Sequence, residues 1–119
     1  MSPYTTAISV SSDTFLPFAA GDVWPRLPET VNVPAEAHAR EDERILVWRD
    51  TGTKGWLPVE DPTAQLKVSA EPGGTRVTFR LDARSAPEVA ALVRSRLEGY
   101  AAGLLAACAS GVRRAVSAR

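Results

Sequence analysis

Few residues of this chain have the side chains that catalysis or metal binding needs. His38 is the only histidine and Cys108 the only cysteine, and they lie far apart in the sequence. Structural zinc sites combine several Cys and His ligands at short spacings, so no metal site is predicted. The glycines at 52 and 55 lack the length and the following helix of a phosphate-binding loop. The sequence therefore predicts no metal and no other cofactor.

A general acid or base is equally hard to assign. A hydrolase triad would have to use His38, which lies in a highly charged segment and is expected to be solvated. Asp22, Glu60, Asp61 and Asp82 lie near the ends of predicted elements, where surface exposure is the usual state. A carboxylate buried in a pocket would instead have a raised pKa and could act as a base. The catalytic residues are therefore left unassigned.

The aromatic residues are the more informative set, because they can converge where a sheet meets a helix. The candidate pocket lining is Trp24, Trp48, Trp56, Phe79, Leu97, Tyr100 and Leu104. One interpretation is a packed core, since aromatic side chains supply much of the buried area of a small domain. The other is an apolar pocket with polar tips from Tyr100 and the tryptophan N–H groups, which is the usual make-up of a small-molecule site. Both interpretations stay open.

A long C-terminal helix must position much of this set. Ser85 and Glu88 have the spacing of a capping box, and Pro87 suits a first helical turn, so a helix is expected from Ser85 to about Val112. Apolar residues recur at steps of three and four and should form one buried face. These residues are Val89, Val93, Leu97, Tyr100, Leu104 and Cys108. The basic segment 113–119 is expected to fray, with its charges favourable at a helix C-terminus.

The rest of the chain shows the alternation of β-strands. The first strand spans about Tyr4–Val10 and continues towards Phe18, and a short helix at Gly21–Leu27 should end at Pro28. The polar segment Pro34–Arg44 is interpreted as a mobile connection or a weak edge strand. The remaining expected strands are Ile45–Arg49 and Trp56–Val59 as a hairpin, then Leu66–Ala70 and Thr75–Asp82 as a second hairpin. Asp61-Pro62 is expected to break the chain between the two hairpins.

These elements predict one α+β domain over residues 1–119. A curved antiparallel sheet of about five to six strands should wrap around the long C-terminal helix, with a short helix after the first strand. This is a helix-grip arrangement. In the last strand, Val77, Phe79 and Leu81 should point towards the helix, while Arg76 and Arg80 point away.

Three short motifs resemble a known superfamily. They are Val23-Trp24 with Leu27 after the first strand, the strand Arg44–Arg49, and the Gly-Gly-Thr hairpin at Gly73–Phe79. Together they resemble the SRPBCC (START-like) superfamily, which includes polyketide cyclases/dehydrases, and the nearest branch is the activator-of-heat-shock-ATPase homologues. The chain looks like a shortened member. The resemblance implies a cavity between helix and sheet that binds a small apolar or amphipathic molecule, with cyclase/dehydrase-type chemistry as an open question.

The composition of the chain limits which partners and which cell compartment are expected. Fourteen basic residues balance fourteen acidic ones, so no strong field favours nucleic acid. No apolar run is long enough to span a membrane, and no secretory signal is visible in residues 1–10. A single cysteine excludes a disulfide framework and favours a reducing cytoplasm. The alanine- and arginine-rich sequence is typical of a GC-rich bacterial genome.

A second hypothesis is a non-catalytic protein-interaction module with a filled core and no ligand cavity. Gly99 and Gly103 each destabilise the helix by about 1 kcal/mol relative to alanine. Their presence is explained either by a close contact that needs a small residue or by simple tolerance in a well-packed helix. With Leu92 beside them, the two glycines would suit a homodimer contact. A small hydrophobic ligand and this homodimer are therefore the expected partners.

Overall fold

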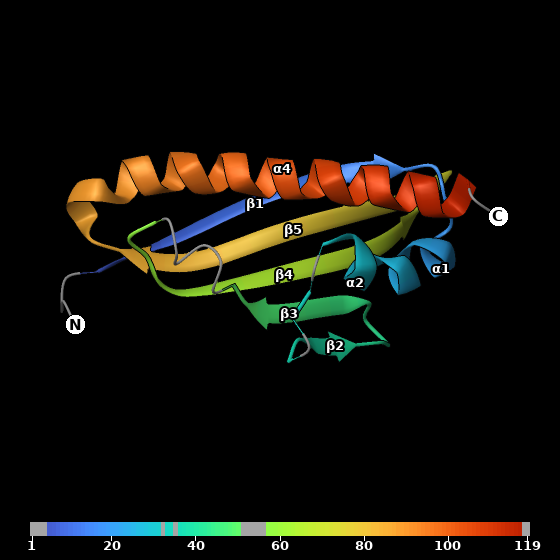
Figure 1. Ribbon diagram of the computed structural model, residues 1–119, viewed down its shortest axis with the longest axis horizontal. Coiled ribbons are helices and arrows are strands. Elements are labelled where there is room, and N and C mark those ends of the chain that lie inside the picture. The colour runs from blue at the N-terminus through green and yellow to red at the C-terminus, as the bar shows by residue number, and fades with distance from the viewer. Residues whose placement is uncertain (1–4, 32, 35, 51–56, 118–119) are drawn as a thin grey trace.

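One antiparallel sheet and one long helix dominate the computed structural model, which describes residues 5–31, 33–34, 36–50 and 57–117 (Figure 1). The sheet order is β1-β5-β4-β3-β2. The strands are β1 (Thr6–Leu16), β2 (His38–Arg40), β3 (Ile45–Arg49), β4 (Glu60–Glu71) and β5 (Gly74–Ser85). Helix α4 (Ala90–Ser117) lies along one face and packs chiefly on β1 and β5. The predicted α+β helix-grip fold is confirmed.

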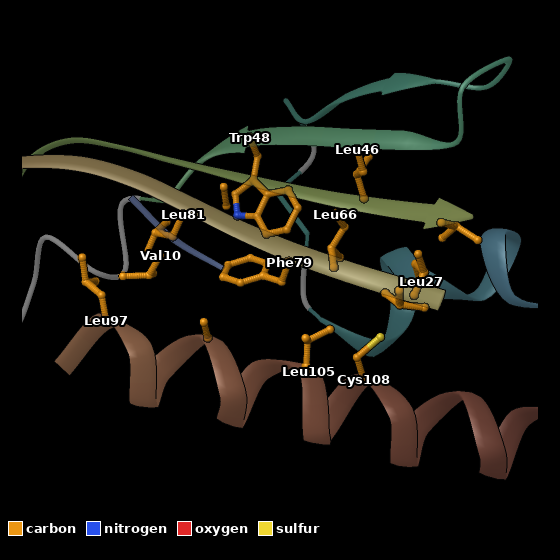
Figure 2. Close-up of a cluster of buried hydrophobic side chains, with 14 of the residues drawn as sticks. Val10, Leu27, Leu46, Trp48, Leu66, Phe79, Leu81, Leu97, Leu105 and Cys108 are labelled. Atoms are coloured by element: carbon orange, nitrogen blue, oxygen red, sulfur yellow. The ribbon is translucent and has the colours of Figure 1, made fainter. Parts of the chain in front are cut away.

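Alternation in the sequence produces the buried face of the sheet. Val77, Phe79 and Leu81 of β5 are fully buried, while Arg76 and Arg80 lie on the opposite face, as predicted. β1 pairs with β5 over its whole length. On β3, the same alternation buries Leu46 and Trp48 and exposes Arg49. The inward side chains of the sheet and of α4 form a single core (Figure 2).

The predicted hairpin between Ile45–Arg49 and Trp56–Val59 is wrong. β3 pairs with residues 63–67 of β4 on one side and with β2 on the other. Trp56 lies outside the described residues, and Val59 is buried but belongs to no strand. Pro34–Arg44 does contain a weak edge strand, since β2 has only three residues, all of them exposed.

The expected break at Asp61-Pro62 is a β-bulge. Asp61 has a φ of 51°, and the β4–β5 register shifts between Glu60 and Thr63. A bulge supplies an extra residue and tolerates a proline that a regular ladder would exclude. β4 therefore runs through the proline and is longer than the alternation from Leu66 suggests.

The connection after β1 contains two short helices. α1 (Ala20–Val23) leads through a 3₁₀ turn at Trp24–Arg26 into α2 (Leu27–Thr30). The prediction that Pro28 ends the helical segment is wrong, because Pro28 occupies the first turn of α2, where its missing N–H is not needed. Val23 and Leu27 anchor the connection in the core.

The junction between β5 and α4 also differs from the prediction. Ser85 is the last residue of β5 and donates to the carbonyl of Ala86 rather than capping a helix. A 3₁₀ turn at Pro87–Val89 precedes α4, and its N-cap is Ala86 with no side-chain hydrogen bond. The capping box is therefore absent. At the other end, the segment expected to fray from residue 113 is helical as far as Ser117.

The buried face of α4 is rotated from the predicted one. Its buried residues are Val93, Leu97, Ala101, Leu105, Cys108, Ala109 and Val112. Tyr100 and Leu104 are only half-buried and lie at the margin of this face. Small residues such as Ala101 contribute little apolar character to the pattern, yet they let the helix approach the sheet closely. Among the described residues, no helix is long and apolar enough to cross a membrane.

Candidate functional site

Three aromatic side chains converge between the sheet and α4. The ring centroids of Trp48 and Phe79 are 6.1 Å apart, and Tyr100 meets Phe79 edge-on at 6.3 Å with an interplanar angle of 71°. Phe79 is completely buried and Trp48 is 7% exposed. Figure 2 shows the Trp48 and Phe79 rings between the strands and α4. Trp48 and Phe79 therefore belong to the packed core, and Tyr100 lies at its margin.

The other predicted pocket residues separate from this cluster. Leu97 is fully buried in the core. Trp24 is half-buried, and its indole N–H donates to the carboxylate of Glu41 in the β2–β3 turn. Trp56 lies outside the described residues. Tyr100 and Leu104 remain at the surface margin, where they line a groove.

This groove lies between α2 and α4, and we call it the α2/α4 groove. It has a volume of about 360 Å³. Its lining residues are Thr30, Val31, Tyr100, Gly103, Leu104 and Ala107. Most of these are apolar or small, and Gly103 and Ala107 keep the α4 wall low. The groove is therefore largely apolar, and Thr30 and Tyr100 are the residues with hydroxyl groups among those that line it.

A buried carboxylate stands behind the Tyr100 wall. The Tyr100 hydroxyl donates to Asp50 Oδ2 at 2.7 Å. Asp50 is 6% exposed and follows β3 directly, and its backbone N–H donates to the Pro62 carbonyl at 2.9 Å. This backbone contact holds the Asp50 main chain against the bulged start of β4. Sequence reasoning misses Asp50, because Asp50-Thr51-Gly52 is typical of a solvated turn.

The floor of the groove is the contact between α2 and α4. The Thr30 hydroxyl donates to the Leu27 carbonyl at 2.9 Å and lies 3.5 Å from Cys108 Sγ. Burial raises the pKa of the Cys108 thiol, and the hydrogen bond from Thr30 opposes this only in part. The thiol is thus a protonated, buried side chain, and a reactive cysteine is not favoured.

The helix glycines do not behave alike. A Cβ on Gly111 would lie 2.8 Å from Thr30 Cγ2, so α2 needs a glycine here. A Cβ on Gly99 or Gly103 would meet no atom within 4 Å. Close contact at Gly99 and Gly103 is therefore absent within the described chain. Leu92 is 56% exposed on the same side of α4, and the homodimer through Leu92, Gly99 and Gly103 stays a prediction.

These contacts predict opposite effects for glycine-to-alanine substitutions. Gly103→Ala and Gly99→Ala should each stabilise the protein by up to about 1 kcal/mol, because alanine favours a helix interior and the space is open. Gly111→Ala should destabilise it, because the new methyl group would displace Thr30. Thermal unfolding followed by circular dichroism measures all three. Equal effects at Gly103 and Gly111 would contradict the α2–α4 contact.

The remaining candidate acid–base residues lie away from the groove. Asp82 pairs with Arg80 at 3.0 Å on the outer face of the sheet. Asp61 is exposed at the bulge, and His38 is exposed on β2. The carbonyl of Asp22 accepts a hydrogen bond from Arg26 at 2.6 Å. None of these residues lines the α2/α4 groove.

Comparison with known proteins bears on the fold. No protein-family model matches the sequence, and no curated protein matches it. Truncated norcoclaurine synthase from Thalictrum flavum aligns with a TM-score of 0.70 at 14% identity, covering 98% of this chain and 97% of that chain. The structure of the same enzyme in complex with dopamine and hydroxybenzaldehyde aligns with a TM-score of 0.67 at 14% identity. This alignment covers 97% of this chain and 89% of that chain.

A third structure gives the same result at lower similarity. Ara h 8.0201 aligns with a TM-score of 0.55 at 11% identity, covering 92% of this chain and 99% of that chain. Similarity at these identities concerns the fold. Like norcoclaurine synthase and Ara h 8.0201, the chain has the helix-grip fold, a curved antiparallel sheet packed on a long C-terminal helix.

Proposed function

We propose that the protein binds a small, largely apolar molecule in the α2/α4 groove and that Tyr100 meets the polar end of this molecule. The observation that carries the proposal is the groove itself, an apolar hollow whose wall includes a tyrosine held by a buried carboxylate. Ligand sites combine apolar lining with a few fixed polar groups in this way. The hydrogen bond to Asp50 fixes the Tyr100 hydroxyl before any ligand arrives.

The size of the groove supports a small ligand. A volume of about 360 Å³ falls at the lower end of the range of about 300–1,000 Å³ for such sites. Leu97, Leu105 and Phe79 fill the space directly between helix and sheet. The proposed site is therefore on the flank of α4 that faces α2, rather than at the centre of the sheet.

The structural comparison suggests which compounds to try first. Norcoclaurine synthase has been solved with dopamine and hydroxybenzaldehyde, two small aromatic molecules that carry polar groups. An aromatic ring would pack on Val31 and Leu104 of this chain, and a hydroxyl would reach Tyr100.

Filling the groove tests the proposal. Gly103→Leu should weaken binding at least about tenfold, equivalent to about 1.4 kcal/mol, because Gly103 lines the groove and a Cβ at this position meets no other atom, which leaves the new side chain free to enter the groove. Gly99→Leu is the matched control: it lies one turn away on the same helix, has the same open space, and does not line the groove. A library of small aromatic and lipophilic compounds, including dopamine and hydroxybenzaldehyde, would be screened by thermal shift and the hits titrated by calorimetry.

Two outcomes would count against the proposal. A hit that binds wild type, Gly99→Leu and Gly103→Leu equally well lies elsewhere on the molecule. A screen without hits favours the alternative, a non-catalytic protein-interaction module. If the wild type and Gly99→Leu bind the compound and Gly103→Leu does not, the result supports binding in the α2/α4 groove.

A further inference from the structure

The outer edge of β1 is long, and the strand itself carries few of the residues that usually protect edge strands. β1 has eleven residues and is the terminal strand of the sheet, whereas the opposite edge strand, β2, has three. Natural edges are commonly protected by lysine, proline, bulges or short length. β1 contains no proline, glycine, lysine or arginine, and Asp13 is its only charged residue. Its backbone groups are therefore well suited to pair with another strand.

One hydrogen bond shows which backbone groups of β1 point outwards. Arg94 of α4 donates from Nη1 to the Ser9 carbonyl at 3.0 Å, so this carbonyl faces away from β5. In an antiparallel strand, the N–H and C=O groups of alternate residues point to the same side. The outward set is thus Ala7, Ser9, Ser11, Asp13 and Phe15, and all five side chains are exposed.

We propose that this edge is a pairing surface for a second copy of the chain, with two β1 strands antiparallel about Ser11 and Arg94 competing for the Ser9 carbonyl. A second copy is the occupant that the strand itself suggests, because Ser11 is the midpoint of Thr6–Leu16. Pairing about this residue overlaps the two strands completely. It joins two sheets into one, as in strand-addition complexes.

The same register avoids contact between like charges and pairs a large side chain with a small one. It places Asp13 opposite the partner's Ser9 and keeps the two Asp13 carboxylates apart, whereas pairing about Asp13 would oppose like charges. It also places Phe15 opposite the partner's Ala7. Phe15 is 38% exposed and is one of the two large hydrophobic side chains exposed among the described residues. The small alanine leaves room for the phenyl ring to be covered.

Arg94 controls access to this edge. Its guanidinium group binds the Ser9 carbonyl, which the N–H of the partner's Asp13 would use in the paired state. It also places a positive charge beside an otherwise nearly uncharged edge. Removing the Arg94 side chain therefore frees both an acceptor and space, and should strengthen pairing.

Cysteine cross-linking tests the surface and its register together. Two Ser11→Cys chains would bring their Cα atoms to about 5.5 Å in a hydrogen-bonded pair, within the range for a disulfide. The native Cys108 is buried and should not react. Under mild oxidation, Ser11→Cys should form a disulfide-linked dimer, and the double variant with Arg94→Ala should form it at least about tenfold faster.

Controls separate this surface from other contacts. Ser9→Cys should cross-link slowly, because each Ser9 would face the partner's Asp13. Arg96→Ala removes a nearby exposed arginine of the same helix and should leave the Ser11→Cys rate unchanged. Sedimentation of Arg94→Ala without added cysteine should show more dimer than wild type.

Three results would overturn the proposal. The first is no cross-link of Ser11→Cys in either background. The second is an Arg94→Ala variant that does not change the rate or the dimer fraction. The third is a dimer whose Ser11 thiols stay apart, which would indicate a different face, such as that of Leu92, Gly99 and Gly103. The Ser11→Cys chain with native Arg94 keeps the test decisive even if Arg94→Ala lowers stability.

Discussion

Replacing Phe79 with alanine should lower the free energy of unfolding by about 3–5 kcal/mol. The Phe79 ring is fully buried at the centre of the sheet and contacts the rings of both Trp48 and Tyr100. The substitution leaves a cavity between β5 and α4 and removes two aromatic contacts at once. A small domain has little stability to spare, so the transition in urea should move to a much lower midpoint.

Phe15→Ala is the matched control for this substitution. Phe15 is on the partner strand β1 but 38% exposed, and its ring contacts Arg76 at 6.0 Å. Its loss should cost less than about 1 kcal/mol. Comparable costs for Phe15→Ala and Phe79→Ala in urea titrations would contradict the assignment of the aromatic cluster to the core.

Leu105→Ala should cost about 2–5 kcal/mol. Leu105 is 2% exposed and lies in the middle of the buried face of α4, near Cys108 (Figure 2). Its removal leaves a cavity that the rigid sheet cannot close. Chemical denaturation measures the change directly.

The neighbouring leucine provides an internal control for the rotation of α4. Leu104 is half-buried and lines the α2/α4 groove, so Leu104→Ala should cost clearly less than Leu105→Ala. The sequence pattern favours the opposite order, because it places Leu104 on the buried stripe. A larger loss for Leu104→Ala would therefore contradict the observed rotation of the helix.

Strand alternation carries most of the information about this fold that can be predicted from sequence. The inward set of β5 and the Leu46/Trp48 face of β3 follow from alternation alone, because a half-buried strand must separate its polar and apolar side chains. The long C-terminal helix follows from its 3.6-residue periodicity in the same way. These local patterns suffice for the α+β helix-grip architecture.

Where the structure differs from the local sequence pattern, contacts between residues distant in sequence account for the difference. The spacing of Ser85 and Glu88 is that of a capping box, yet pairing with β1 keeps Ser85 in β5. Asp61-Pro62 is typical of a chain break, yet pairing with β5 on both sides of the bulge keeps β4 continuous. In each case, a strand partner distant in sequence overrode the local signal.

The candidate site was only partly predictable for the same reason. Tyr100 and Leu104 were predicted pocket residues and do line the α2/α4 groove. The sequence does not indicate Thr30 and Val31, because Pro28 is typical of the end of a helical segment, whereas here it begins the short helix that carries both residues towards α4. Asp50 was missed because a carboxylate in a turn shows no sign of burial until Tyr100, fifty residues later, is brought against it.

The most direct test of the central claim is to map a bound ligand by NMR. The compound that raises the melting temperature most would be added to isotope-labelled protein, and backbone amide shifts would be followed during the titration. Binding in the α2/α4 groove predicts shifts concentrated at Thr30, Val31, Gly103 and Ala107. Shifts confined to the outer face of the sheet, around Lys67 and Thr78, would contradict it.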